Sequence, residues 1–140
     1  MSKVFEGNGS CLCGAVGFTA SQAEKSIGAC HCQMCRKWGG GPLIGAHCGS
    51  DVSFSGGEEI SIYSSSDWAE RGFCKLCGSH LFYRLKDNMH HFIPVGLFDD
   101  QNQFVLERQS YIDKKPPYYS FSNSTHDMTE AEMMEKYGTS

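Results

Sequence analysis

The chain has 140 residues, which is enough for one domain, and carries a formal net charge of −4 with an isoelectric point near 5.8. This acidic balance argues against general binding to nucleic acid or to anionic membranes. Hydrophobic residues make up 40% of the chain, and eight cysteines accompany 16 glycines. Such a composition favours short strands and turns over long amphipathic helices.

The N-terminal residues 1–10 are a polar lead-in without the apolar core of a secretory signal. No run approaches the roughly 18 apolar residues that a membrane span needs. We therefore expect a cytoplasmic protein that does not enter a membrane. Thiols stay reduced in that compartment, so the eight cysteines are interpreted as metal ligands rather than as disulfides.

Taken in order, the first half of the chain predicts short strands around two cysteine motifs. Cys11 and Cys13 are read as an extended pair, since residues two apart in a strand point to the same side. Strands are predicted at 15–19 and 27–30, and a short helix at 33–38. The run Gly39-Gly40-Gly41-Pro42 ends that helix.

The second half predicts further strands and one helix. Strands are expected at 43–48, 52–54, 60–63, 79–85 and 91–98, with another starting at 104. The motif Cys74-Lys75-Leu76-Cys77-Gly78 predicts a tight turn. Asp127 and Glu130 resemble a capping box that opens a helix at about 128–137, which Gly138 closes. We expect a single zinc-binding domain over 1–140, with its core at about 5–120.

Two of the cysteine pairs form a complete ligand set for one zinc ion. Structural zinc prefers four tetrahedral ligands, usually thiolate or imidazole. Cys11, Cys13, Cys74 and Cys77 supply four thiolates from two close pairs about sixty residues apart. We predict a structural zinc here, which would join the first cysteine pair to the middle of the chain.

The motif between these pairs has only three cysteines, Cys30, Cys32 and Cys35. Three protein ligands leave one coordination position open, as in catalytic zinc sites. A thiol bound to zinc is deprotonated at neutral pH, so such a site suits thiol chemistry. The sequence therefore predicts a second, open zinc site and two zinc ions per chain.

Ligand count alone leaves alternatives open for this motif. Cys48, His31 or His47 would close the site if one of them supplied a fourth ligand, and a metal-free redox cluster of thiols is a further reading. His31 itself stands between two predicted ligands. In an extended segment its side chain points away from them, so it is either a structural group or a catalytic base. His31 is our candidate catalytic residue. No residue is predicted to bind an organic cofactor.

Three motifs together resemble the glutathione-dependent formaldehyde-activating enzyme family, whose domain is shared with centromere protein V. They are GSCLCGAV at 9–16, CHCQMCR at 30–36 and FCKLCGSHLF at 73–82. The segment VGLFDD at 95–100 is also similar to the family. The likeness covers roughly residues 5 to 120, but 110–119 departs from the family pattern, in which a lysine and a tryptophan follow a strand.

The resemblance implies a mainly β fold, a zinc-stabilised β-tent of small antiparallel sheets with a short C-terminal helix added in this chain. It implies that the four-cysteine set holds a structural zinc and that Cys30, Cys32 and Cys35 hold a second zinc with an open place. The implied activity is that of a carbon–sulfur lyase of the S-hydroxymethylglutathione synthase type.

Two hypotheses of function follow. In the first, the chain is a zinc-dependent enzyme that joins a small thiol such as glutathione to a small aldehyde such as formaldehyde. In the second, it is a non-catalytic zinc module that mediates a protein interaction, an analogy at the level of the fold. The oligomeric state is open in both.

Overall fold

The computed structural model describes residues 2–138, which divide into two compact units. Unit 1 is formed by the segment up to Lys25 and the segment from Gly45 to Phe104. Unit 2 is formed by the segment from Ser26 to Ile44 and the segment from Val105 onward. Each unit is discontinuous in sequence. The expectation of one domain over 1–140, whose end residues 1, 139 and 140 lie outside the described part, stays a prediction.

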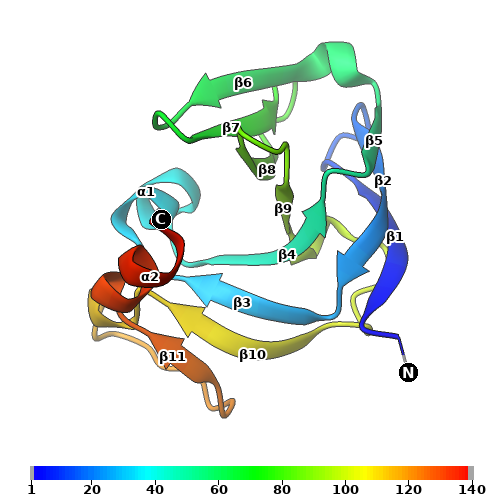
Figure 1. The fold of residues 1–140 in the computed structure, drawn as a ribbon. Helices are drawn as coiled ribbons and strands as arrows, with labels where there is room; N and C mark the ends of the chain where they lie inside the picture. The colour runs from blue at the N-terminus through cyan, green and yellow to red at the C-terminus, as the bar shows by residue number, and fades with distance from the viewer. Residues whose placement is uncertain (1, 139–140) are drawn as a thin grey trace. The chain divides into compact units, whose positions relative to one another are not determined.

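Unit 1 consists of antiparallel strands in two groups (Figure 1). A three-stranded sheet has the order β1-β2-β5, and a second set of paired strands has the order β4-β9-β8-β7-β6. Two 3₁₀ turns, η1 (Gly57–Glu59) and η2 (Val95–Leu97), complete it. The strands are β1 (Val4–Ser10), β2 (Gly17–Glu24), β4 (Leu43–Gly49), β5 (Val52–Ser55), β6 (Ile60–Ser64), β7 (Ala69–Cys74), β8 (His80–Leu85) and β9 (His91–Pro94). The first two residues of β4, Leu43 and Ile44, belong to unit 2.

An aromatic cluster forms part of the core of unit 1. The Phe98 ring lies edge-on to Phe18 and to Phe104, with 5.0 Å between ring centroids in both pairs. Phe5 of β1 packs edge-on against Phe104 at 5.4 Å. Edge-to-face packing of this kind stabilises aromatic pairs beyond their buried area. It fixes β1 and β2 beside the segment that follows β9.

Unit 2 contains three strands and both helices. β10 (Val105–Ser110) pairs in parallel with β3 (Ser26–Cys30) on one side and with β11 (His126–Met128) on the other. Parallel pairing needs a long connection between strands. Here β3 and β10 are separated in sequence by the whole second segment of unit 1. Helices α1 (Gln33–Gly39) and α2 (Glu130–Tyr137) and the 3₁₀ turn η3 (Ile112–Lys114) complete the unit.

The prediction of a mainly β fold with a short C-terminal helix is confirmed, with local differences. Residues 1–10 contain strand β1 instead of a plain lead-in, because pairing with β2 overrides the low strand propensity of its glycines. The parallel pairing in unit 2 departs from the expected antiparallel sheets. The predicted strand at 91–98 ends at Pro94, where η2 begins.

Helix α2 starts as the sequence suggests, but with a different capping pair. Thr129, not Asp127, is the N-cap: its side chain accepts a hydrogen bond from the Glu132 backbone N–H, and the Glu132 side chain accepts one from the backbone N–H of Thr129. Gly138 closes the helix with a left-handed φ of 74°, as predicted. The threonine prevails because it stands directly before the first helical residue, where the cap geometry is met.

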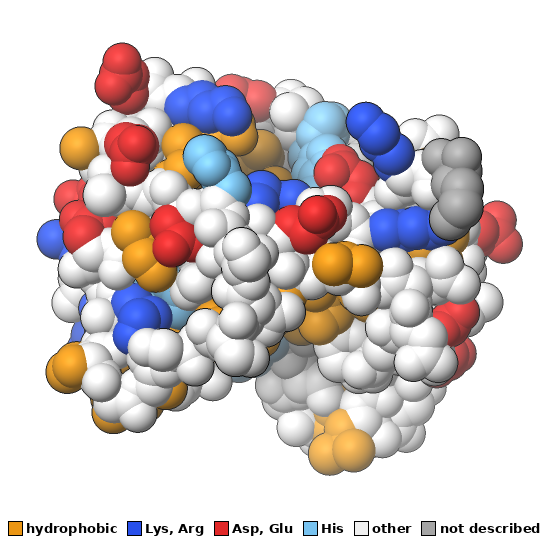
Figure 2. All heavy atoms as spheres, turned by 90° about the horizontal axis from the view of Figure 1, so that it is seen from below, with side chains coloured by type: hydrophobic (Ala, Val, Ile, Leu, Met, Phe, Trp, Pro, Cys, Tyr) orange, Lys and Arg blue, Asp and Glu red, His pale blue; other side chains and the backbone are white. Residues whose placement is uncertain are grey.

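Charges are mixed on one face of the protein. On the face drawn in Figure 2, acidic and basic side chains lie interspersed, without a broad basic patch on that face. Among residues 2–138 no helix has the length and apolar character to cross a membrane.

Candidate metal centres

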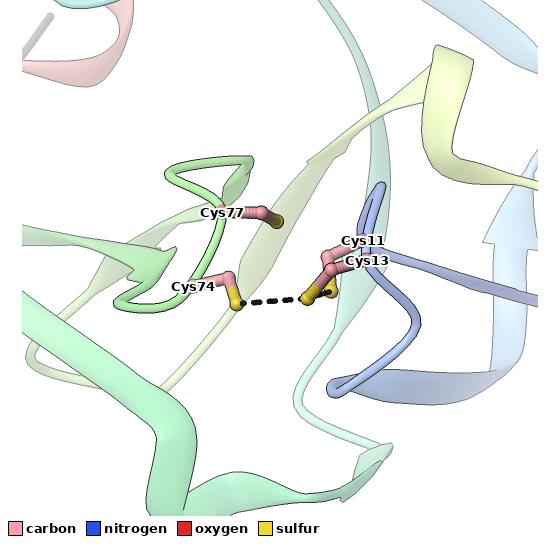
Figure 3. A group of neighbouring side chains, drawn as sticks. All are labelled: Cys11, Cys13, Cys74 and Cys77. Atoms are coloured by element: carbon pink, nitrogen blue, oxygen red, sulfur yellow. Dashed lines mark hydrogen bonds between the residues drawn. The ribbon is translucent and has the colours of Figure 1, made fainter.

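Four cysteine sulfurs meet in unit 1, as Figure 3 shows. The Sγ atoms of Cys11, Cys13, Cys74 and Cys77 all lie within 4.8 Å of one another. Cys11 and Cys13 are 3.6 Å apart, and Cys13 and Cys74 are 3.8 Å apart. Tetrahedral zinc with Zn–S bonds near 2.3 Å places neighbouring sulfurs about 3.8 Å apart. This four-cysteine cluster therefore has the dimensions of a zinc–thiolate tetrahedron.

Two tight turns present these sulfurs. The predicted turn after β7 is present, with Gly78 donating to the Cys74 carbonyl at 2.7 Å. The first pair was expected in an extended strand, and this is wrong: Cys11 and Cys13 stand in a turn closed by Gly14 N–H on the Cys11 carbonyl at 3.2 Å. Gly14 and Gly78 have φ of 81° and 78°, a left-handed conformation that glycine adopts without strain. The two halves of the cluster thus use similar turns.

Backbone and hydroxyl groups support the negative charge of two of these sulfurs, those of Cys11 and Cys77. The Val16 N–H donates to the Cys11 sulfur at 3.4 Å. The Ser79 hydroxyl lies 3.2 Å from the Cys77 sulfur and accepts a hydrogen bond from the Leu12 N–H at 3.0 Å, so it links the two turns. Hydrogen bonding from Ser79 lowers the pKa of the Cys77 thiol to about 5. Such donors favour the thiolate, the form that binds metal.

The second cluster lies in unit 2 and contains three sulfurs. The Sγ atoms of Cys30, Cys32 and Cys35 lie within 4.8 Å of one another. Cys32 and Cys35 are buried and Cys30, at the end of β3, is half-buried. Contact with the Cys30 and Cys32 sulfurs raises the pKa of the Cys35 thiol far above its usual range. A bound cation reverses this effect, because coordination deprotonates a thiol.

The start of helix α1 sets the spacing of this three-cysteine cluster. Cys32 is the N-cap residue, and its sulfur accepts a hydrogen bond from the Cys35 N–H at 3.3 Å. One helical turn then brings Cys35 back to the same side as Cys32. The helix ends at Gly39, and Gly40 follows with φ of 82°, so the predicted stop is confirmed.

Apolar side chains from distant parts of unit 2 pack against this cluster. Tyr111 is buried with Cys32 and Cys35, while Met34, Leu43 and Met133 pack around them. The Tyr111 hydroxyl also lies 3.9 Å from the Met134 sulfur. The C-terminal helix, which the sequence suggested only as a tail, therefore supplies part of the wall behind the sulfurs.

The residues proposed as a fourth ligand are engaged elsewhere. Both ring nitrogens of His31 make hydrogen bonds, and Cys48 is fully buried in unit 1 with its thiol 3.4 Å from the Ala46 carbonyl. His47 bonds to Glu24 and His90. Within the described residues, the group of metal-type ligand atoms around Cys30 contains only the three sulfurs.

His31 is fully buried at the centre of a hydrogen-bond chain. Its Nε2 lies 2.8 Å from the Gln109 side-chain oxygen, and its Nδ1 lies 2.8 Å from the Tyr119 hydroxyl. The Gln109 amide nitrogen donates to Thr125 at 3.0 Å, and the Thr125 hydroxyl donates to Asp127 at 2.6 Å.

The carboxylate of Asp127, at the end of this hydrogen-bond network, determines which group donates and which accepts at each step. Asp127 only accepts, so the single Thr125 proton points to it and Thr125 accepts from the Gln109 amide. The Gln109 oxygen then faces His31, which must carry its proton on Nε2. Its Nδ1 accepts from Tyr119. Burial lowers the pKa of His31, which agrees with a neutral ring.

Sequence reasoning did not find the partners of His31. Gln109 and Tyr119 lie 78 and 88 residues away from it, and no spacing pattern links them. Tyr119 falls in the stretch that departs from the family pattern.

Comparison with known proteins shows the family to which the chain belongs. A sequence model of the glutathione-dependent formaldehyde-activating enzyme family matches residues 6–114. The chain belongs to this family. The match contains all seven cysteines of the two clusters.

Two relatives extend the comparison. The chain is 36% identical over 132 residues to an uncharacterized lyase of Schizosaccharomyces pombe, covering 94% of this chain and 95% of the relative. A crystal structure of a Rhodobacter sphaeroides protein has a TM-score of 0.54 and 26% identity, covering 66% of this chain and 87% of that one. Family and relative together support an enzyme of the lyase kind that activates an aldehyde with glutathione.

Proposed function

We propose that this chain is a zinc-dependent carbon–sulfur lyase that joins a small thiol such as glutathione to a small aldehyde such as formaldehyde. The observation that carries the proposal is the three-cysteine cluster: its three sulfurs lie within 4.8 Å of one another, and no further His, Cys, Asp or Glu of the described residues belongs to this group. The family and the lyase relative give the proposal its reaction class.

The donor sets suit zinc at both clusters. Four thiolates at tetrahedral spacing form a closed site, and three thiolates leave a position for a substrate. We assign a structural zinc to Cys11, Cys13, Cys74 and Cys77, and a second zinc to Cys30, Cys32 and Cys35. Bound at the second site, zinc supplies a Lewis acid that holds a thiol as thiolate at neutral pH.

The chain itself arranges the approach to the second site. Cys30 is half-buried, whereas Cys32 and Cys35 are buried among apolar side chains, so a substrate would reach the site past Cys30. The apolar wall excludes water from the other side, which strengthens electrostatic interactions there. Lys37 is exposed on α1, and Arg36 is half-buried with its Nε donating to the His31 carbonyl at 2.9 Å. These cations complement the carboxylates of glutathione.

The proposed role of His31 is positioning. Its ring has no exposed surface and its two nitrogens bind Gln109 and Tyr119. His31 stands between two of the proposed ligands in the sequence. The hydrogen-bond network that runs from Asp127 through His31 to Tyr119 therefore fixes the backbone that carries Cys30 and Cys32. A direct contact of His31 with substrate would require this network to open.

Metal counting combined with a glutathione titration tests the proposal. We expect two zinc ions per chain by elemental analysis, and X-ray absorption should show one additional sulfur neighbour when glutathione is added. Exchange spectroscopy with ¹³C-formaldehyde should show formation and breakdown of S-hydroxymethylglutathione faster than in buffer. Cys48→Ala is the matched control, since it removes a buried cysteine outside both clusters.

Three outcomes would contradict the proposal: one zinc per chain, a zinc environment that glutathione leaves unchanged, or exchange no faster than in buffer. Two zinc ions with a closed second site and no exchange would favour the non-catalytic zinc module instead.

A further inference from the structure

A third group of metal-type side chains lies in unit 1, outside the cysteine clusters. His47 on β4 donates from Nδ1 to the Glu24 carboxylate. On its other side, His47 Nε2 lies 3.0 Å from Nδ1 of His90. The three side chains thus form a line from a carboxylate through one imidazole to a second.

Glu24 determines which nitrogen of His47 is available. An ionised carboxylate accepts only, so His47 carries a proton on Nδ1 and, when neutral, presents a lone pair on Nε2. A carboxylate that holds the far nitrogen of an imidazole is the arrangement that orients metal-binding histidines and makes them more basic. That lone pair points towards His90.

The His90 ring is held in place by a constrained turn. Met89 adopts a left-handed φ of 59°, which is uncommon for a residue other than glycine. Three hydrogen bonds support the turn: Met89 N–H to the Leu85 carbonyl, Leu85 N–H to the His90 carbonyl, and His90 N–H to the Asn88 side chain, each 3.0 Å long. Strained residues of this kind persist where the surrounding structure demands one geometry.

His47 packs against an aromatic ring on one side and is partly exposed to solvent. Phe92 lies opposite His47 in the strand register, and its ring centroid is 5.0 Å from that of His47. The side chains of His47 and Glu24 remain 28% and 41% exposed. His90 is half-buried, so both imidazoles lie at the surface of unit 1, where an ion from solution can approach them.

We propose that His47 Nε2 and His90 Nδ1 bind a zinc ion, with Glu24 orienting His47 and water completing the coordination. Imidazole is a preferred ligand of zinc. Two imidazole nitrogens on tetrahedral zinc lie about 3.4 Å apart, so the observed 3.0 Å pair opens by a few tenths of an ångström. His90 moves its ring proton to Nε2, so binding to the neutral pair releases no net proton. With two protein ligands, this site binds more weakly than either cysteine cluster.

Equilibrium dialysis of the zinc-loaded full chain against graded Zn²⁺ tests the inference. We expect a weakly bound zinc ion beyond those held by the cysteine clusters, removed by a mild chelator. His90→Ala and His47→Ala should each lose it and keep the tightly bound zinc. His126→Ala, which removes an exposed histidine of unit 2, should keep it.

Imidazole ¹⁵N NMR gives a second readout that does not depend on activity or on the cysteine sites. Zn²⁺ should shift His47 Nε2 and His90 Nδ1 and leave the His126 ring unchanged. Glu24→Gln should weaken binding about 10–100-fold, the usual cost of removing an orienting partner. The inference is overturned if the weakly bound zinc is absent, if it survives both alanine variants, or if Glu24→Gln binds as tightly as the wild type.

Discussion

The two cysteine clusters differ by one ligand and by what surrounds them. The four-cysteine cluster joins two similar turns of unit 1, and its Cys13 is exposed. The three-cysteine cluster lies at the start of α1, has two buried sulfurs and is backed by Tyr111 and Met133. A closed set of ligands can only hold the fold together, whereas an incomplete set in an apolar wall can also take a substrate. This contrast is the basis of the proposed function.

The largest effect on stability is expected when the four-cysteine cluster loses a ligand. We predict that Cys77→Ser unfolds or aggregates the protein. Apparent zinc-binding free energies in small modules are about 10–16 kcal/mol, which is comparable with a typical net stability of about 5–15 kcal/mol. Circular dichroism and thermal melting of the purified variant check this.

Cys48→Ala is the control for that variant. It removes a fully buried cysteine of the same unit but no cluster ligand, so it should cost only about 1 kcal/mol. A Cys77→Ser protein that melts like Cys48→Ala would show that the four-cysteine cluster is not what holds unit 1 together.

Removing a ligand from the open site should separate activity from folding. We predict that Cys32→Ser stays folded, loses one zinc ion and is inactive in the exchange assay. Serine is a good N-cap residue, so its hydroxyl replaces the sulfur that accepts from the Cys35 N–H. The substitution therefore removes a metal ligand with little damage to α1.

Elemental analysis, melting temperature and exchange rate together decide this prediction. Collapse equal to that of Cys77→Ser would mean that both clusters are structural, and the contrast between them would fail.

A smaller effect is expected in the network behind the open site. Tyr119→Phe removes the hydroxyl that donates to His31 Nδ1, so we expect a loss of about 1 kcal/mol in the free energy of unfolding. If the network positions the ligands, the variant should also slow exchange while retaining two zinc ions.

Tyr118→Phe provides the comparison for that variant, because the neighbouring Tyr118 side chain is 75% exposed. Urea unfolding and exchange kinetics should be nearly unchanged there. An equal effect of the two substitutions would show that the hydrogen bond to His31 has no special role.

The smallest expected effect is a loss of stability as the pH is lowered. Burial lowers the pKa of His91, whose Nδ1 donates to the Gly49 carbonyl at 3.1 Å. The unfolded chain, with an ordinary histidine pKa near 6.5, then binds the proton first as the pH falls. The contribution of His91 to the free energy of unfolding is therefore complete above about pH 6.5, and it is lost as the pH falls below that value.

Urea unfolding between pH 7.5 and 5.5 measures this loss, which should be smaller in His91→Gln than in the wild type. The cysteine clusters also respond to acid, but they are common to both proteins. Identical pH dependence of the two would contradict the assignment to His91.

The sequence determined the grouping of the cysteines into two clusters and most local elements. Close spacing alone groups Cys30, Cys32 and Cys35, and glycines predict the end of α1 and the turn at Cys74. Strands such as β6 and β8 follow from alternation of side chains. These features depend on neighbours within a few residues, where backbone geometry limits the possibilities.

Only the tertiary structure decided the parts that depend on distant contacts. The sequence did not predict the parallel pairing of β3 with β10, the turn at Cys11, or the network that holds His31 neutral and buried. Nor did it indicate that Met133 packs against the open cluster or that His47 meets His90. Apart from the turn at Cys11, which is local but is held by a hydrogen bond from the Leu12 N–H to the distant Ser79 hydroxyl, each of these features joins residues far apart along the chain. Their proximity follows from packing of the whole fold and leaves no local pattern in the sequence.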